Sequence, residues 1–303
     1  MAQADTQSSL SVNAVVPDPG VFKILQEVIA DFREYRDLLF QLTLRDIRIR
    51  YKQAVMGFGW AVFLPALVVL AGVLVRGAMA YISGGELQTE EIVGVAVKSV
   101  PWSFFVGAIG FATNSLTGNG SLVTKIYFPR EVFPVSAVLA QTFDSTIGTV
   151  ALVLILPFLG VTFGWSVLWV PLLAALLFLF TVAVGVFLAC GNLFFRDVKY
   201  IVRVLLTFGI FFTPVFFEPA MFGATGAWAM MLNPLAPILE GIRLSIVEHH
   251  NLLQPLWIAG RDGGQVIAWE PWFLAYSAAW AVFGLLGATV MFHRLEYVFA
   301  EYV

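Results

Sequence analysis

Few side chains in this sequence combine the type and the spacing that catalysis or metal binding requires. Glu248, His249 and His250 are consecutive, so they do not share one helical face, and no further His or Cys stands nearby to complete a four-ligand metal site. The third histidine, His293, falls on the other side of the membrane in the topology derived below. We therefore expect no catalytic residue and no metal ligand in this chain.

The phosphate-binding loop Gly-x-x-x-x-Gly-Lys-Ser/Thr is absent from the sequence. The chain therefore has no nucleotide cradle of that type, and any work driven by ATP needs a second polypeptide. We expect no cofactor in this chain, since ATP and Mg²⁺ would belong to such a partner. The formal net charge of −3 provides no basic stripe, which argues against nucleic acid as a partner.

Asp144 is an acidic residue well inside a long apolar stretch, and Gln141, Thr142, Ser145 and Thr146 stand beside it. An Asp at the centre of a bilayer costs about 2.5 to 3.5 kcal/mol on insertion scales. Its carboxylate should therefore face protein or water rather than lipid. Gln141 and Asp144 accordingly mark either a polar seam between helices or a polar transport path.

Charged side chains gather at two further places. Glu240 and Arg243 are three residues apart, so they can pair on one helical face within an apolar stretch. Four cations precede the first long apolar segment, namely Arg45, Arg48, Arg50 and Lys52. Such a cluster attracts anionic headgroups or a pyrophosphate, or it serves only to orient and anchor the chain in the membrane.

The elements that must position these residues are membrane helices. The sequence is 59% hydrophobic and 12% charged, whereas soluble domains carry about 25% charged residues. No Asp, Glu, Lys or Arg occurs in the 51 residues from Ser145 to Phe195. As one helix this stretch would extend roughly 77 Å against the ~30 Å core of a bilayer, so it crosses at least twice. We therefore predict an all-α membrane protein.

Six apolar windows predict six transmembrane helices. They cover approximately residues 54–75, 99–117, 134–159, 167–192, 200–217 and 271–292. An even number of spans puts both termini on one side of the membrane. With the termini inside, 13 of the 17 Lys and Arg residues lie on the inner side, so the positive-inside rule predicts cytoplasmic termini.

The remaining segments complete the predicted organisation. We predict that residues 1–20 are a disordered cytoplasmic extension. Residues 21–53 have the amphipathic pattern of a helix that lies in the membrane interface or packs on another protein. Residues 54–303 form the transmembrane domain. Within its outer segment, 218–270, the stretches 219–232 and 234–247 are too short to cross and predict two re-entrant helices.

Several motifs occur in a characteristic order along the chain. They are Leu-Thr-Leu-Arg-Asp-Ile-Arg-Ile-Arg-Tyr-Lys-Gln at 42–53, Tyr-Phe-Pro-Arg-Glu-Val-Phe-Pro at 127–134, Asn-Leu-Phe-Phe-Arg-Asp-Val at 192–198, Thr-Pro-Val-Phe-Phe at 213–217 and Asn-Pro-Leu at 233–235. Phe-His-Arg-Leu-Glu at 292–296 near the C-terminus also fits, and the order and spacing of the motifs together cover the chain from about residue 30 to its end. In these motifs the chain resembles the membrane subunits of ABC transporters that export polysaccharides, which are the permeases for O-antigen, capsule and teichoic-acid precursors.

This resemblance implies a homodimer of six-span subunits that encloses a glycan channel, with two copies of a separate ATPase subunit at the cytoplasmic face. It implies that the ATPase contacts the N-terminal interfacial helix, the 118–133 loop and the 193–199 loop. The coupling residues implied in the two loops are Ser121, Leu122, Lys125, Tyr127, Phe128, Arg130, Glu131, Arg196 and Asp197.

The resemblance also implies places along the channel. The two short outer helices correspond to an outer gate, with Asn233, Pro234, Glu240 and Arg243 as its residues. Most aromatic side chains at the span ends are expected to be interfacial anchors or packing residues. Aromatic faces also bind the C–H edges of sugar rings, so the alternative is that a subset lines the channel. The candidates for the channel or the helix seam are Phe104, Gln141, Asp144, Phe212 and Phe216.

We hypothesise that the chain is the permease of a bacterial ABC exporter that moves a polyprenyl-pyrophosphate-linked polysaccharide, such as an O-antigen, across the inner membrane. It would be a transport subunit rather than an enzyme, with membrane lipid around it. Two alternatives stay open, namely a permease for drugs or other lipids and a polyprenol-dependent membrane transferase. O-antigen, capsule and teichoic acid fit the motifs equally well.

Overall fold

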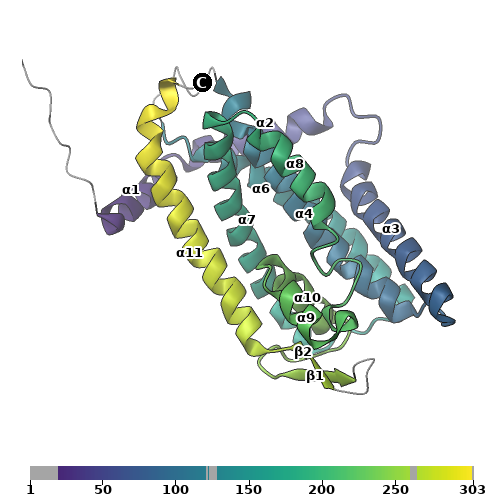
Figure 1. The fold of residues 1–303 in the computed structure, drawn as a ribbon. Coiled ribbons are helices and arrows are strands. Elements are labelled where there is room, and N and C mark those ends of the chain that lie inside the picture. Colours follow the sequence, from purple (N-terminus) through teal and green to yellow (C-terminus); the bar gives the residue numbers. More distant parts are fainter. Residues whose placement is uncertain (1–19, 121, 123–127, 260–264, 302–303) are drawn as a thin grey trace, which may run out of the picture.

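The computed structural model describes residues 20–120, 122, 128–259 and 265–301. Long helices form a bundle, and a small sheet lies at one end of it (Figure 1). Within the described residues, five helices are long and apolar enough to cross a membrane. They are α3 Gly59–Ser83, α4 Thr89–Gly118, α6 Val132–Ile155, α7 Trp169–Phe194 and α11 Pro271–Leu295. Short 3-10 turns extend α6 to Leu159 and precede α7 from Trp165. The chain is thus a mostly helical membrane protein.

Helix α7 forms the centre of the bundle because it is apolar on all sides. It packs against α4, α6, α10 and α11. Leu173, Thr181 and Ala189 on α7 are fully buried. Helix α3 behaves differently, since Leu67, Leu70 and several other large apolar side chains on it are exposed. The exposed face of α3 therefore needs lipid or another protein surface to cover it.

The N-terminal segment predicted as an interfacial helix consists of two helices, α1 Val21–Glu34 and α2 Arg36–Tyr51. Helix α1 is amphipathic and buries Ile24 and Val28, whereas its exposed side is mixed and carries Lys23 and Arg33 beside Phe22 and Ile29. It packs against α11, and α2 packs against α6. In Figure 1 both helices lie at the end of the bundle where α11 ends.

Two of the predicted spans are longer than their apolar windows. Helix α3 continues through Arg76 to Ser83, and α4 begins at Thr89 and passes through Lys98. A hydropathy window ends at such charges. In the fold, however, the positive charges of Arg76 and Lys98 are each paired with a carboxylate from another segment of the chain. Arg76 is 4% exposed and pairs with Glu91 and Glu218, while Lys98 is 2% exposed and pairs with Glu240.

The predicted fifth span, residues 200–217, is not one long helix. Helix α8 Val198–Gly209 has 12 residues, and turns follow it up to residue 217. Pro214 lacks a backbone N–H and disfavours the helical conformation of the residue before it, which accounts for the interruption. The described residues therefore contain five helices of spanning length instead of the six that were predicted.

The outer segment contains two short helices, as predicted, and a sheet that was not predicted. After a 3-10 turn at Pro219–Phe222 come α9 Gly223–Met231 and α10 Leu235–Ile246, and every residue of α10 is buried. Strands β1 Leu256–Ala259 and β2 Gln265–Trp269 form an antiparallel pair. The all-α classification fits the long helices, and this two-stranded sheet is a small addition to them. Figure 1 shows α9, α10 and both strands at the end of the bundle opposite α1.

Candidate functional site

An open cavity of about 680 Å³ lies between α2, α3, α4 and α6. We call it the aromatic cavity because rings form much of its wall. The end of α2 contributes Arg50 and Tyr51, the first half of α3 contributes Trp60 and apolar side chains, and α4 and α6 complete the wall. Its lining includes Arg50, Tyr51, Trp60, Trp102, Phe104, Phe111, Gln141 and Asp144.

A polar cluster on the wall of this cavity connects α2 to α6. Nη1 of Arg50 lies 2.6 Å from Oδ2 of Asp144 and donates a hydrogen bond of 2.8 Å to Oε1 of Gln141. The hydroxyl of Tyr51 donates to Oδ1 of Asp144 at 2.6 Å. The Arg50 guanidinium also lies over the Phe111 ring, 3.7 Å from its centroid. Gln141 and Asp144 meet the same partner because residues three apart share a helical face.

The carboxylate of Asp144 therefore has a partner for each oxygen. Two interpretations were left open for Asp144, a polar seam between helices and a polar transport path. The geometry is compatible with both, because Asp144 joins two helices and also lines a cavity. Burial, together with the hydrogen bond to Asp144, raises the pKa of Tyr51. Its hydroxyl thus remains protonated and available as a donor. The sequence analysis did not select Tyr51 as a site residue, although it directly follows Arg50 in the basic motif.

The four cations of the predicted headgroup cluster have different surroundings. Arg50 is committed to Asp144, and Arg45 forms an ion pair of 2.8 Å with its neighbour Asp46. Arg48 and Lys52 are exposed and form no ion pair within the described part of the chain. The structure thus does not bring the four together as one binding surface.

The three predicted channel phenylalanines also separate. Phe104 is buried and lines the aromatic cavity. Phe216 is buried elsewhere, against Gly72 of α3, and Phe212 is 73% exposed after the end of α8. The structure adds rings that sequence reasoning did not select, namely Trp60, Trp102 and Phe111. Only the packing of α3 on α4 reveals which rings share one cavity.

A second cavity, of about 390 Å³, lies between α4 and α8. Lys199 and Arg203 stand one turn apart in its wall, beside the polar side chain of Asn114, and the lining contains no acidic residue. We call it the basic pocket. Trp102, Val202 and Leu206 are shared with a third, apolar cavity of about 700 Å³ that extends to α11, which we call the apolar groove.

The predicted gate residues lie at the opposite end of the bundle. Nη2 of Arg243 lies 2.7 Å from Oε1 of Glu240, as their spacing predicts, and Glu240 is 1% exposed. Nζ of Lys98 on α4 lies 3.5 Å from Oε2 of the same carboxylate, and Glu248 pairs with Arg243 at 3.1 Å. We call Lys98, Glu240 and Arg243 the Glu240 cluster. The sequence analysis placed Lys98 outside a span, so it did not predict that Lys98 belongs to this cluster.

Asn233 and Pro234 form the connection between α9 and α10. Oδ1 of Asn233 accepts a hydrogen bond of 3.1 Å from the backbone N–H of Leu235, which fixes the start of α10. The carbonyl of Pro234 accepts a hydrogen bond of 2.8 Å from the hydroxyl of Ser277 on α11. These contacts hold the two short helices against the last long helix.

The predicted coupling residues are only partly placed. Ser121, Lys125 and Tyr127 lie outside the described residues. Arg196 and Asp197 are exposed between α7 and α8, and Leu122 is half-buried. Phe128 is buried and packs on Phe133, with 5.4 Å between the ring centroids, so it is not available on a docking surface.

Arg130 and Glu131 also turn inward, toward α11. The backbone N–H of Arg130 donates to Oε1 of Glu296 at 3.2 Å, and its guanidinium donates to the Glu296 carbonyl. Glu131 is 3% exposed, so its side chain lies in the interior, and its part in ATPase coupling stays a prediction. Burial, and then the nearby carboxylate of Glu296, raise the pKa of Glu131 to about 8.

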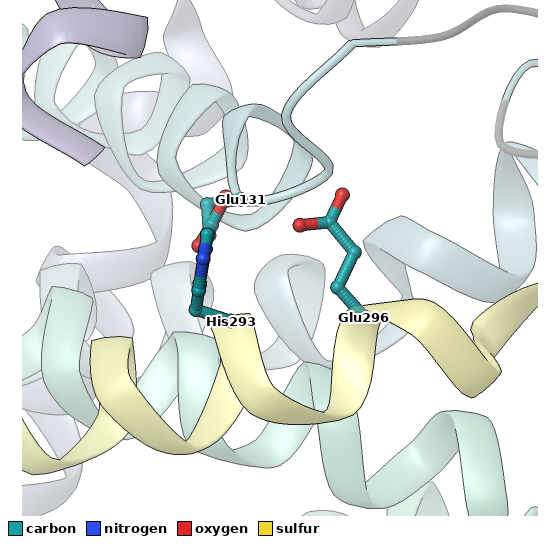
Figure 2. A group of neighbouring side chains, drawn as sticks. All are labelled: Glu131, His293 and Glu296. Atoms are coloured by element: carbon teal, nitrogen blue, oxygen red, sulfur yellow. The ribbon is translucent and has the colours of Figure 1, made fainter. Parts of the chain in front are cut away.

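Figure 2 shows Glu131, His293 and Glu296 gathered between the start of α6 and the end of α11. One ligand atom from each lies within 4.8 Å of the other two. The sequence does not indicate that these three side chains meet, because Glu131 and His293 are far apart along the chain. The spacing of His293 and Glu296 on one helical face is the only local signal.

Residues 37–247 match the ABC-2 type transporter family. An O-antigen export system permease protein RfbA from Myxococcus xanthus is 28% identical over 228 residues, which is 73% of this chain and 85% of the relative. Two proteins of the same name from Klebsiella pneumoniae are 28% and 26% identical, covering 67% and 74% of this chain and 77% and 86% of the relatives. The family match extends from α2 to the end of α10 and includes the aromatic cavity, the basic pocket and the Glu240 cluster. The chain therefore belongs to the ABC-2 type transporter family.

Proposed function

We propose that this chain is the permease subunit of an exporter that moves a lipid-linked polysaccharide of the O-antigen type across the bacterial inner membrane. A second copy of the chain completes the channel, and two copies of a separate ATPase subunit drive transport. Family membership and the names of the relatives support this proposal. The single observation in the structure that carries it is the composition of the aromatic cavity.

The wall of the aromatic cavity suits a long polar glycan. Trp60, Trp102 and Phe111 provide flat apolar faces for the C–H edges of sugars, and Gln141 provides polar atoms for hydroxyl groups. The Arg50 charge is neutralised by Asp144. A wall of this kind contacts each sugar weakly and carries no unpaired charge, so successive sugars can move along it.

The exposed face of α3 supports the proposed dimer. Its large apolar side chains lie next to a cavity that is open on one side. A second copy that packs on α3 would cover this face and close the cavity into a channel. In the same arrangement α8 and the turns after it form the sixth crossing, with both termini in the cytoplasm as the distribution of Lys and Arg predicts.

The basic pocket and the apolar groove together suit the lipid end of such a substrate. Lys199 and Arg203 lie where a phosphate or pyrophosphate would bind, and no acid in the lining opposes it. The groove that continues past Trp102 is lined by aliphatic and aromatic side chains, as an isoprenoid tail requires. Arg48 and Lys52 are exposed and available to attract the anionic headgroup.

The proposed ATPase surface lies at the end of the bundle that carries α1 and the end of α11 (Figure 1). Arg196 and Asp197 are exposed at the start of α8, and Lys23, Arg33 and Glu34 are exposed on α1. Binding of ATP in the partner would act on these segments. The Glu240 cluster at the other end would then hold α10 in place as part of the outer gate.

The proposal is tested by transport in vesicles that contain the chain and its ATPase subunit. A polyprenyl-pyrophosphate-linked glycan is presented on the outside of inverted vesicles, and its protection from an added glycosidase is measured. We expect protection that requires ATP and both subunits. ATP-dependent movement of a small hydrophobic dye or another lipid, without any movement of the glycan, would contradict the proposed substrate.

A further inference from the structure

Three side chains from distant parts of the sequence converge where the start of α6 meets the end of α11 (Figure 2). Glu131 directly precedes α6, His293 lies in the last turn of α11, and Glu296 begins the 3-10 turn that follows. A carboxylate oxygen of each Glu and one ring nitrogen of His293 lie within 4.8 Å of one another. This separation is close enough for one ion to contact all three after small rotations of the side chains.

Glu131 is the central residue of this group, because its side chain is buried and one of its carboxylate oxygens accepts no hydrogen bond from the described part of the chain. The residue is 3% exposed, and its Oε1 atom has no hydrogen-bond partner among the described residues. A buried carboxylate oxygen without a partner loses its hydration and gains nothing in exchange. Figure 2 shows this carboxylate beside the His293 ring and across from Glu296.

The surroundings contain more acids than bases. Glu27 lies 3.5 Å from Nε2 of His293, and Asp31 interacts electrostatically with both Glu131 and Glu296. Two cations balance part of this charge: Arg130 lies 4.0 Å from Glu296, and Lys23 lies 3.7 Å from Glu27. The backbone N–H of Arg130 donates a hydrogen bond to Oε1 of Glu296. The other carboxylate oxygen of Glu296 remains to bind a cation. A dication between the carboxylates would remove their mutual repulsion.

We propose that Glu131, His293 and Glu296 bind one divalent transition-metal ion, and that Zn²⁺ fits the donor set best. One imidazole and two carboxylates are ligands that Zn²⁺ accepts in tetrahedral sites, which leaves a fourth position for water. Mg²⁺ prefers all-oxygen octahedral sites, and Mn²⁺ binds nitrogen ligands less tightly than Zn²⁺ does. Glu27 lies 3.5 Å from Nε2 of His293, the place of the acids that commonly orient metal-bound histidines, which leaves Nδ1 for the ion.

The ion would reach the site through an open cavity of about 330 Å³ that Asp31, Tyr35, Arg130, His293 and Glu296 line. Once bound, it would join α11 to the segment that leads into α6. This connection lies at the end of the bundle where we propose that the ATPase binds. The metal site itself does not depend on which substrate the protein transports.

The test uses the purified full-length chain in nanodiscs, freed of metal with a chelator. We expect Zn²⁺ to bind with a stoichiometry of one per chain, measured by elemental analysis after gel filtration, and to raise the melting temperature. Glu131→Gln, His293→Gln and Glu296→Gln should each weaken Zn²⁺ binding by at least about tenfold. The double variant His249→Gln/His250→Gln removes the other two histidines and should bind Zn²⁺ as the wild type does.

Co²⁺ added to the wild-type chain provides a readout that does not depend on whether a variant folds. We expect d–d absorption bands of a low-symmetry site with nitrogen and oxygen ligands, which Zn²⁺ abolishes by competition. Absence of these bands, or Zn²⁺ binding that is lost only in the His249→Gln/His250→Gln variant, overturns the proposal. A third outcome also overturns the proposal: Zn²⁺ leaves the melting temperature of the wild type unchanged, while Glu131→Gln raises that of the metal-free chain. Glu131 would then hold a proton instead of a metal ion. Glycan transport is measured separately, so its failure leaves this result intact.

Discussion

Arg50 and Asp144 are separated by 94 positions in the sequence, and Nη1 of Arg50 lies 2.6 Å from Oδ2 of Asp144. The pair links the end of α2 to the middle of α6. Because both groups line the aromatic cavity, their pairing also decides that this part of the wall is electrically neutral. The same contact thus contributes to the packing of the helices and to the proposed glycan path.

Removal of one partner of this pair should destabilise the protein. Asp144→Ala leaves the Arg50 guanidinium, whose side chain is 14% exposed, without its counter-charge, and we expect a loss of about 3 kcal/mol. The measurement is denaturant unfolding of the chain in mixed micelles. Arg48→Ala on the exposed face of α2 is the control and should stay within about 0.5 kcal/mol. The double variant Arg50→Met/Asp144→Leu should be more stable than Asp144→Ala, and a less stable double variant would contradict this account.

Glu240 compensates two buried cations, Lys98 and Arg243, so its loss should be costly. We expect Glu240→Gln to lower the free energy of unfolding by about 3 to 5 kcal/mol, since two charges stay buried without a full partner. Glu248→Gln removes a half-exposed acid that pairs with the same arginine and should cost less than about 1 kcal/mol. Thermal unfolding of both variants side by side measures the difference. Equal effects would show that Glu240 is not the centre of the cluster.

Gly72 allows α3 to pack closely on α4. A Cβ atom at this position would lie 2.5 Å from Cγ1 of Val95 and 2.9 Å from Cδ1 of Phe216. Because Val95 is β-branched and buried, it cannot rotate away freely, and we expect Gly72→Ala to cost about 1 to 3 kcal/mol. Gly110→Ala on α4 meets no heavy atom within 4 Å and should be neutral or stabilise by up to about 1 kcal/mol. Melting temperatures of the two variants provide the comparison.

Lys199 and Arg203 should determine affinity for a phosphate-bearing isoprenoid. Each substitution to Ala removes about 1 kcal/mol of attraction to the anion, which corresponds to about fivefold in affinity for undecaprenyl phosphate. Binding is measured with the purified chain in detergent by quenching of tryptophan fluorescence, since Trp102 lines both the pocket and the groove. Arg36→Ala removes an exposed cation outside the pocket and should leave binding unchanged. The phosphate-free alcohol should bind all four proteins alike, and a loss of its binding in Lys199→Ala would argue against a phosphate site.

Local composition was enough to predict most of the membrane helices. The windows at 134–159, 167–192 and 271–292 agree within a few residues with the apolar helices of the structure, apart from the C-terminal extension of the last one. The sequence also predicted the break between the two short outer helices at Asn233 and Pro234, and the amphipathic helix α1. These features depend on hydrophobicity and turn chemistry within about 20 neighbouring residues, so no tertiary contact is needed to recognise them.

Only the tertiary structure decided where the charged residues belong. Arg76 and Lys98 lie inside long helices because acids from other segments neutralise them, and a sequence window cannot know that those acids are near. The sequence gives no sign that Glu131 is buried, because its surroundings include Glu296 at the end of α11, more than 150 positions away. The energy of a charge in a membrane protein is set by its partner, and the partner is chosen by the fold.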